Sequence, residues 1–270
     1  MTAIICSILW LFTFVHCVYG DNGGWEFPGE SKIGMDGPCT VDRVDGQLLT
    51  SERFLAEYAY NKPVVIFNVD NKRFQQRCEK ETMLAEWENA DVVLNSANTY
   101  SYTRVPSTFG KYVNEQLKPQ SLETLGNETL YLFGDIDQTL WRPLLAEYKL
   151  PAWTLPNYEP ALSFGIAGSQ TGVPFHFHGP GFAEIIFGSK RWFLSPYEER
   201  PDFNPDKSTL DWYINEYPKL NASQRPLECL MKPGELIYFP DKWWHATLNA
   251  ETSVFISTFL SPIVSSKIEL

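Results

Sequence analysis

The stretch TGVPFHFHGPGFAEIIFGSKRWFLSP, residues 171–196, joins short apolar runs with two histidines that are one residue apart. In an extended strand, successive side chains alternate between the two faces, so His176 and His178 point to the same side. Two imidazoles then reach one small volume, and imidazole is the commonest metal ligand in proteins. The stretch therefore predicts β structure that carries a candidate metal site.

Short runs rich in aromatic and β-branched residues continue through the chain from residue 158 onward, separated by Gly, Pro and Asn. Such residues favour strands, and the separators favour turns. Repeated short strands of this kind are typical of a small barrel or jelly roll, which we expect over residues 158–264. The runs are ALSFGIAG (161–168), VPFHFH (173–178), FAEIIF (182–187), KRWFLS (190–195), GELIYF (234–239), WWHATL (243–248) and SVFISTFL (253–260), with a short helix expected at LDWYINEY (210–217).

The preceding residues, 51–157, mix helical and strand patterns and are expected to support the barrel. Residues 21–50 form an N-terminal arm, whose Gly- and Pro-rich first part, Asp21–Gly37, is expected to be loose. With 44% hydrophobic residues in a chain of 270, we expect one folded domain, mainly β with flanking helices. The expected elements of the first half are helices from Ser51 and over Glu81–Asn89, and strands over Val64–Phe67 and Asp91–Leu94.

Both ends of the chain resemble sorting signals. Residues 1–20 contain no charged side chain and end in small residues after an apolar run, which is typical of a cleaved secretory signal peptide. An uncleaved membrane anchor is the alternative. Residues 267–270, KIEL, differ by one residue from the KDEL signal that returns soluble proteins to the endoplasmic reticulum. We therefore expect a soluble protein of the endoplasmic reticulum lumen, with no membrane span after cleavage.

Two glycosylation sequons fit the same compartment, at Asn127 and Asn221. The net charge of −11 argues against a nucleic-acid partner or an anionic membrane surface, because both require a positive field. The expected partners are therefore proteins of the secretory pathway, and the oligomeric state is left open.

The cysteines permit at most one internal disulfide in the mature chain. Removal of residues 1–20 leaves Cys39, Cys78 and Cys229 in an oxidising compartment. Cys229 lies in a strand-like, apolar run, where a free cysteine behaves as a small hydrophobe. The predicted pair is therefore Cys39 with Cys78, and three unpaired buried thiols are the alternative.

The histidines are few and concentrated. The chain has four, and His16 falls in the predicted signal peptide. The other three are the pair at 176 and 178 and His245, which lies in a separate predicted strand. A lone histidine is most often a core or surface residue, but three of three in an HxH plus distant His pattern predict a ligand set. Zinc, iron and copper are all compatible with imidazole ligands.

At these residues the sequence resembles the jumonji-C (JmjC) family of the cupin superfamily. The resemblance covers most of the mature chain: KPVVIF (62–67), the core stretch 171–196, and PGELIYFPDKWWHATLN (233–249). It implies a double-stranded β-helix that holds Fe(II) through an HxD/E…H triad, with 2-oxoglutarate as cosubstrate. By position, the resemblance implies that His176 is the first ligand and His245 the last, and Lys190 falls where the family has the lysine that binds the far carboxylate of 2-oxoglutarate.

The middle ligand departs from the family pattern, because His178 stands where the family has Asp or Glu. Three neutral imidazoles leave the full charge of a dipositive ion for another ligand to balance. Three imidazoles with one open position are also a zinc pattern. The sequence therefore predicts a site for Fe(II) or Zn(II), while the same change argues against ordinary turnover of 2-oxoglutarate.

Glu184 is the acid that could replace the missing charge. If residues 188–189 form a two-residue hairpin turn, Lys190 and Phe187 share a face, and Glu184 lies on the opposite one. The apolar company of Phe187 favours the Lys190 face as the inward one, although a bulge would reverse this. An inward lysine in apolar surroundings is costly without an anion, so it predicts a carboxylate ligand.

The remaining residues near the histidines have structural interpretations. Phe175 and Phe177 alternate with the histidines and are expected to face away from the site. Trp192 and Tyr238 are expected in the core, and Asn249 is expected to cap a strand end.

Two functions of different class fit the sequence. One is a lumenal JmjC protein with an atypical HxH…H metal site that acts as a binding or regulatory protein with weak or no oxygenase activity, a pseudoenzyme. The other is an Fe(II)- and 2-oxoglutarate-dependent protein hydroxylase of secretory-pathway substrates. The altered ligand His178 favours the first, and Lys190 favours the second. Histone demethylation does not fit the expected compartment.

Overall fold

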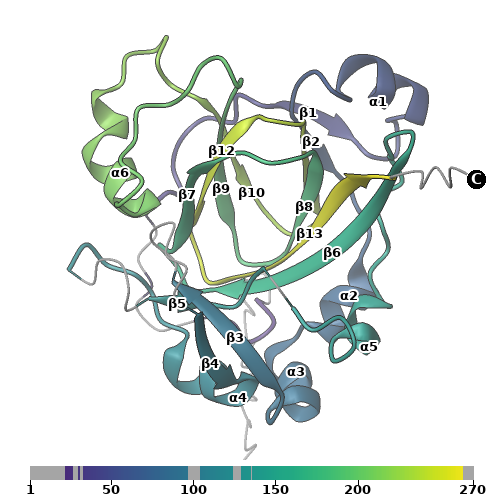
Figure 1. Ribbon diagram of the computed structural model, residues 1–270, viewed down its shortest axis with the longest axis vertical. Coiled ribbons are helices and arrows are strands. Elements are labelled where there is room, and N and C mark those ends of the chain that lie inside the picture. The colour runs from purple at the N-terminus through teal and green to yellow at the C-terminus, as the bar shows by residue number, and fades with distance from the viewer. Residues whose placement is uncertain are drawn as a thin grey trace, which may run out of the picture.

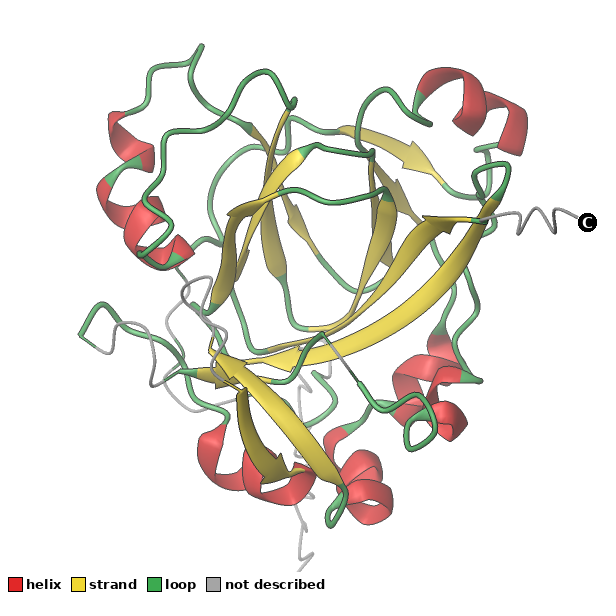
Figure 2. Cartoon of the chain, in the orientation of Figure 1, coloured by secondary structure: helices red, strands yellow, loops and turns green. Residues whose placement is uncertain are grey.

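The computed structural model describes residues 22–26, 30, 33–96, 104–123, 129–134 and 136–263. The predicted signal peptide, the sequon at Asn127 and residues 267–270 lie outside them. Figure 2 shows strands at the centre of the molecule and helices at its periphery. The fold is therefore mainly β with flanking helices, as the sequence predicts.

Two sheets face each other and form the barrel (Figure 1). Among the described residues, six strands form one sheet in the order β1-β2-β11-β8-β13-β6, and four form the other in the order β10-β9-β12-β7. Only β1 and β2 pair in parallel within these two sheets as described. The bounds are β1 (Asp42–Asp45), β2 (Val64–Phe67), β6 (Tyr158–Ala167), β7 (Gly172–His176), β8 (Gly181–Phe187), β9 (Lys190–Ser195), β10 (Leu227–Met231), β11 (Glu235–Phe239), β12 (Trp244–Asn249) and β13 (Ser253–Pro262). This arrangement is the jelly-roll form of the double-stranded β-helix.

Strand β8 is buried along its whole length because both of its faces are covered. Ala183 and Ile185 pack between the two sheets. Phe182 and Ile186 point the other way and pack against the N-terminal half of the chain. The two-residue alternation of β structure therefore holds from Phe182 to Ile186, and it breaks at a β-bulge at the end of the strand, where Ile186 and Phe187 both pack in the outer cluster.

The N-terminal half supplies an outer layer of helices and a small sheet in the order β4-β3-β5. Helix α1 begins after its N-cap Thr50, whose hydroxyl accepts a hydrogen bond from the Arg53 amide at 3.1 Å. None of the helices in the described part of the chain is long and apolar enough to cross a membrane. The bounds are α1 (Ser51–Glu57), α2 (Lys72–Arg77), α3 (Lys80–Trp87), α4 (Phe109–Lys111), the π-helix η1 (Tyr112–Gln116), α5 (Arg142–Leu145), β3 (Asp91–Ser96), β4 (Arg104–Thr108) and β5 (Leu130–Tyr131).

The expected helix within the β half is α6 (Thr209–Asn215), followed by a short 3-10 helix η2 (Tyr217–Lys219). Figure 1 shows α6 beside β7, on the outer face of the four-stranded sheet. The Ser208 side chain caps α6 by accepting from the Asp211 amide at 3.0 Å.

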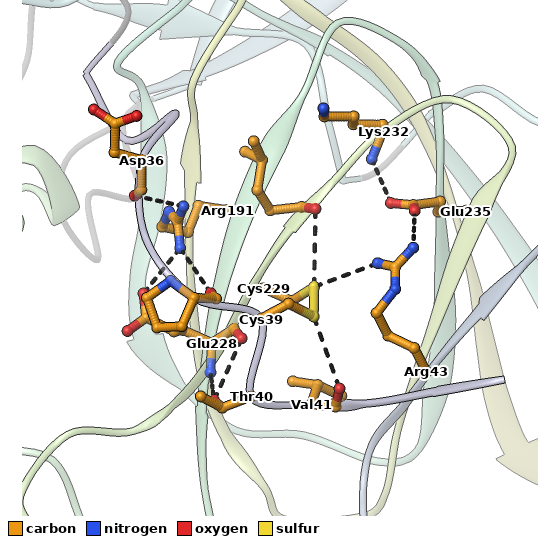
Figure 3. The surroundings of a disulfide bond; sticks show 12 residues. Asp36, Cys39, Thr40, Val41, Arg43, Arg191, Glu228, Cys229, Lys232 and Glu235 are labelled. Atoms are coloured by element: carbon orange, nitrogen blue, oxygen red, sulfur yellow. Dashed lines mark hydrogen bonds and ion pairs between the residues drawn. A yellow bond between two sulfur atoms is a disulfide. The ribbon is translucent and has the colours of Figure 1, made fainter. Parts of the chain in front are cut away.

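The described part of the N-terminal arm packs against the barrel, so the prediction of a loose arm is wrong. Trp25 is fully buried, and its indole N–H donates to the Cys78 carbonyl at 2.8 Å. Further along, the Arg191 guanidinium donates to the carbonyls of Gly34 (2.7 Å) and Asp36 (2.6 Å), as Figure 3 shows for Asp36. Gly and Pro here give an irregular backbone whose polar groups find partners on the barrel.

The predicted disulfide is also wrong, because Cys39 pairs with Cys229 and not with Cys78 (Figure 3). Cys78 is a free, buried thiol. The arm runs along the edge strand β10 just before β1, where the Thr40 amide donates to the Glu228 carbonyl at 2.7 Å. That crossing brings together two cysteines that are 190 residues apart in the sequence. The pairing depends on which sheet edge the arm follows, which local sequence patterns do not show.

Candidate metal centre

The pairing of β7 with β12 brings two of the three histidines together. His176 and His245 are direct cross-strand partners, and their ring centroids are 4.2 Å apart. His178 follows just beyond the end of β7, with its ring centroid 4.7 Å from that of His245. One ring nitrogen from each histidine lies within 4.8 Å of the other two. The structure thus assembles the ligand set that the sequence predicts.

A backbone carbonyl holds Nδ1 of each ring. Because a carbonyl oxygen can only accept, these contacts place the ring proton on Nδ1 and leave a lone pair on Nε2. This is the tautomer in which a histidine binds a metal through Nε2. The contacts are His176 with Pro174 (2.8 Å), His178 with Gly179 (2.8 Å) and His245 with Trp243 (2.9 Å).

The Nε2 atoms of two of these rings face each other, with 3.2 Å between those of His178 and His245. When both Nδ1 atoms carry protons, two lone pairs meet, and this contact is repulsive unless a cation lies between them. A proton is a poor source of that charge, because burial lowers the pKa of His176 to about 4 and also lowers the pKa values of His178 and His245. The donor set therefore fits a metal ion bound by three Nε2 atoms.

The histidines line a largely apolar cavity between the two sheets. It encloses about 540 Å³ of empty space, its mouth included. None of the described residues that line it is acidic, so no carboxylate in this lining replaces the missing middle ligand. Its aromatic walls are Tyr131, Phe133, Trp192, Phe239, Phe255 and Phe259.

Glu184 lies on the outer face of the barrel, as the sequence predicts. Its carboxylate accepts hydrogen bonds from the Asn71 amide (2.8 Å) and the Tyr148 hydroxyl (2.9 Å). Burial raises the pKa of Glu184 to about 7, and the hydrogen bonds from Tyr148 and Asn71 oppose that rise. The Glu184 carboxylate therefore binds side chains of the outer layer and is not a ligand partner of the histidines.

The outward face of Glu184 follows from a predicted hairpin turn at residues 188–189, and that hairpin prediction is wrong. Strands β8 and β9 belong to different sheets, and the two residues cross from one sheet to the other. Gly188 has a φ of +74°, and a Cβ there would lie 2.1 Å from the Thr252 carbonyl oxygen, so only glycine fits. A β-bulge at Ile186, the residue that β8 has in excess over β13, turns Phe187 into the outer cluster, so Phe187 does not share a face with Lys190.

Lys190 points into the cavity and is only 4% exposed. Its Nζ lies 2.9 Å from the centroid of the Phe255 ring and makes no hydrogen bond or ion pair with any described residue. Burial holds the pKa of Lys190 well below its usual value. Lys190 pairs with Asn249, four residues along β12 from His245, which separates their backbones by roughly 13 Å. The cavity therefore offers metal ligands at one end and an amine at the other.

The sequence does not predict that several residues, now seen in the cavity wall, lie beside the histidines. Trp192, predicted to be core, lines the cavity and stacks on His245 with 5.8 Å between ring centroids. Asn249, predicted to cap a strand end, lines it and donates to the Thr171 carbonyl at 3.0 Å. Tyr131 and Phe133 enter from the N-terminal half, and no sequence signal marks them as neighbours of the histidines.

In strand β13, the alternation of residues does indicate which side chains line the cavity. Phe255 and Phe259 alternate with outward residues in SVFISTFL, and both line the cavity. The prediction that Phe175 and Phe177 face away is confirmed, since Phe175 packs in an outer cluster and Phe177 is 41% exposed. Asn221 is exposed on the surface after η2, and its glycosylation stays a prediction.

A comparison with known proteins identifies the same region. A family model described as the JmjC domain matches residues 163–266. JmjC domain-containing protein 8 of Rattus norvegicus is 47% identical over 264 residues, which cover 95% of this chain and 96% of that protein. The human protein of the same name is 49% identical over 240 residues, covering 88% of this chain and 90% of that protein.

A more distant relative is the bifunctional arginine demethylase and lysyl-hydroxylase psr-1 of Caenorhabditis elegans. It is 23% identical over 267 residues, which cover 87% of this chain and 65% of that protein. The barrel, the converging histidines and the near 50% identity along almost the whole length agree. The chain belongs to the JmjC family, with JmjC domain-containing protein 8 among its relatives.

Proposed function

We propose that this chain is a JmjC protein of the endoplasmic reticulum lumen that binds a divalent metal ion and an acidic ligand. It acts as a binding or regulatory protein with weak or no oxygenase activity, a pseudoenzyme of its family. The observation that carries the proposal is His178: three neutral imidazoles converge where the family has two imidazoles and a carboxylate, and no acid lines the described cavity wall.

The metal is held by Nε2 of His176, His178 and His245. Three imidazoles with one open position suit Zn(II), whereas Fe(II) in oxygenases is typically held by two histidines and one carboxylate. A bound ion supplies a Lewis-acidic position for one further ligand. Without a protein carboxylate, an anionic ligand is favoured there because it offsets the dipositive charge.

Lys190 gives the second contact for that ligand. An amine without a hydrogen-bonding partner among the described residues, in apolar surroundings, favours an anion because the pair offsets the cost of burying either charge alone. A ligand with an acidic group at each end, such as 2-oxoglutarate, reaches both Lys190 and the metal. The acidic ligand is therefore proposed to be a short dicarboxylate.

The lumenal assignment is supported by the apolar N-terminus, the KIEL ending and the two sequons at Asn127 and Asn221. The pairing of Cys39 with Cys229 adds support, because disulfides persist in oxidising compartments. Protein partners in the secretory pathway follow from this location.

The alternative function is an Fe(II)- and 2-oxoglutarate-dependent protein hydroxylase acting on secretory-pathway substrates. Two observations favour it: Lys190 faces the cavity as a cosubstrate anchor would, and the relative psr-1 is named a lysyl-hydroxylase. Metal analysis of the protein purified from a secretory host, together with a 2-oxoglutarate decarboxylation assay, separates the two. The main proposal expects about one bound metal per chain with little decarboxylation. Robust coupled turnover supports the alternative, and a protein that takes up neither zinc nor iron contradicts both.

A further inference from the structure

A disulfide cross-links the two barrel sheets at one edge. Strands β1 and β10 are edge strands of different sheets. Cys39 precedes β1, and Cys229 lies in the middle of β10, so the disulfide ties one sheet to the other (Figure 3). Without this bond, the segment before β1 would still contact β10 through the hydrogen bond that the Thr40 amide donates to the Glu228 carbonyl, at 2.7 Å.

The two cysteines differ in accessibility. Cys39 lies in an exposed run that extends from Asp36 to Thr40, whereas Cys229 is fully buried. An external thiol can therefore approach from the Cys39 side, while the barrel shields Cys229. Because thiol exchange depends on which sulfur can be attacked, this asymmetry makes Cys39 the attacked sulfur and Cys229 the leaving group.

A positive charge stands beside the leaving sulfur. Arg43 Nη1 lies 3.7 Å from Cys229 Sγ, and an ion pair with Glu235 holds the guanidinium in place (Figure 3). The same guanidinium lies over the Phe67 ring, 5.6 Å from its centroid. A cation at this position stabilises a thiolate that would otherwise be costly to form in a buried site.

We propose that the Cys39–Cys229 disulfide is a thiol-exchange site for a low-molecular-weight thiol of the glutathione class. The incoming thiolate attacks Cys39 Sγ and forms a mixed disulfide there. The original sulfur–sulfur bond breaks, and its electron pair leaves on Cys229 Sγ as a thiolate beside Arg43. One thiol is consumed and one thiol is produced, so the step needs no other oxidant or reductant.

Thiol exchange at the disulfide affects the proposed metal centre through one neighbouring side chain, that of Trp192. Cys229 is the direct cross-strand partner of Trp192, and both belong to the same cluster between the sheets. Trp192 in turn stacks on His245. Freeing Cys229 loosens the wall that positions His245, so the adduct binds metal more weakly than the disulfide form. This consequence rests on the proposed metal site, whereas the exchange itself does not.

The test treats the folded, oxidised protein with reduced glutathione at several urea concentrations below the unfolding transition. Peptide mapping by mass spectrometry locates the adduct. We expect it on Cys39, formed at a rate that urea does not change, while the buried Cys78 stays unmodified. Arg43→Gln should slow adduct formation about tenfold, because the leaving thiolate loses its cation. Arg43→Lys should recover most of the rate, and Arg53→Gln, which removes an exposed arginine on α1, should not change it.

Two results would overturn the exchange site. One is an adduct that forms only in proportion to the unfolded fraction, which would make the disulfide purely structural. The other is an Arg43→Gln variant that is folded, as judged by its urea transition, and reacts as fast as the wild type.

The coupling is tested by titrating Zn(II) into the oxidised protein and into the Cys39 adduct. We expect several-fold weaker binding by the adduct, with a changed fluorescence response of Trp192, assigned by comparison with Trp192→Phe. An oxidised protein that binds neither Zn(II) nor Fe(II) contradicts the proposed metal site. Equal affinities in the two forms contradict the coupling and leave the metal site standing.

Discussion

Replacing Lys190 with methionine should stabilise the ligand-free protein. The methionine side chain matches the apolar stem of lysine but lacks the amine, which makes no hydrogen bond or ion pair with the described residues around it. Leaving a buried polar group without a partner costs about 1–3 kcal/mol. We therefore expect Lys190→Met to raise the free energy of unfolding by at least about that amount near pH 7, because protonation of the buried amine adds to the cost.

The dependence on pH gives a sharper test. Burial lowers the pKa of Lys190 in the folded protein below that of the unfolded chain. Between these two pKa values the unfolded chain binds one more proton, so the wild-type free energy of unfolding rises with pH by about 1.4 kcal/mol per unit from this group. This protonation-linked part of the cost is fully present below the folded-state pKa and is lost as the pH rises to the unfolded value, whereas the cost of the unpaired neutral amine remains. The advantage of Lys190→Met should therefore shrink as the pH rises from 7 toward 10.

Urea unfolding followed by tryptophan fluorescence at several pH values measures this difference. The control is Lys219→Met on η2, whose side chain is 68% exposed and should change stability little at any pH. Succinate or 2-oxoglutarate should then stabilise the wild type, because either anion pairs with the amine, but not Lys190→Met. Parallel stability profiles of wild type and Lys190→Met across this pH range would refute the view that Lys190 is a dehydrated, unpaired amine.

Three further predictions concern the metal, its middle ligand and the compartment. His176→Ala should abolish stoichiometric zinc and remove the rise in melting temperature that zinc gives the wild type; retained stoichiometric metal would contradict the ligand assignment. His178→Asp should restore a set of two histidines and one carboxylate, raising Fe(II) affinity and uncoupled 2-oxoglutarate decarboxylation, and no gain would mean that the cavity no longer accepts the cosubstrate. Endoglycosidase H should increase the gel mobility of the protein from secretory cells by removing glycans at Asn127 and Asn221, and an unglycosylated cytosolic protein would contradict the lumenal proposal.

The sequence was informative wherever a short-range pattern decides the structure. Alternation along a strand placed His176 and His178 on one side and the two flanking phenylalanines on the other, and the structure agrees. Glu184 likewise fell on the outer face, although the supporting hairpin does not exist. The prediction for Glu184 is nevertheless correct, because Glu184 and its neighbours in β8 alternate between the two faces whether or not β9 pairs with β8.

Pairing across long sequence separations could not be predicted in the same way. Elimination among the three cysteines predicts a Cys39–Cys78 pair, but the arm follows β10 and Cys39 bonds to Cys229 instead. Trp192 carried no sign that it faces the histidines, since a buried tryptophan looks the same in a packed core and in a cavity wall. Such contacts depend on sheet order and on which edges lie side by side.

The sequence by itself determined the strands, the facing of their side chains and the three imidazoles available for a metal, because these follow from composition and a two-residue period. Only the tertiary structure decided that the Nε2 atoms converge, that no acid joins them in the described cavity lining, and that Lys190 stands among aromatic rings without a hydrogen-bonding partner there. It also decided the disulfide. These properties arise where strands far apart in the chain close around one volume, and burial there sets the charge state and partners of each group.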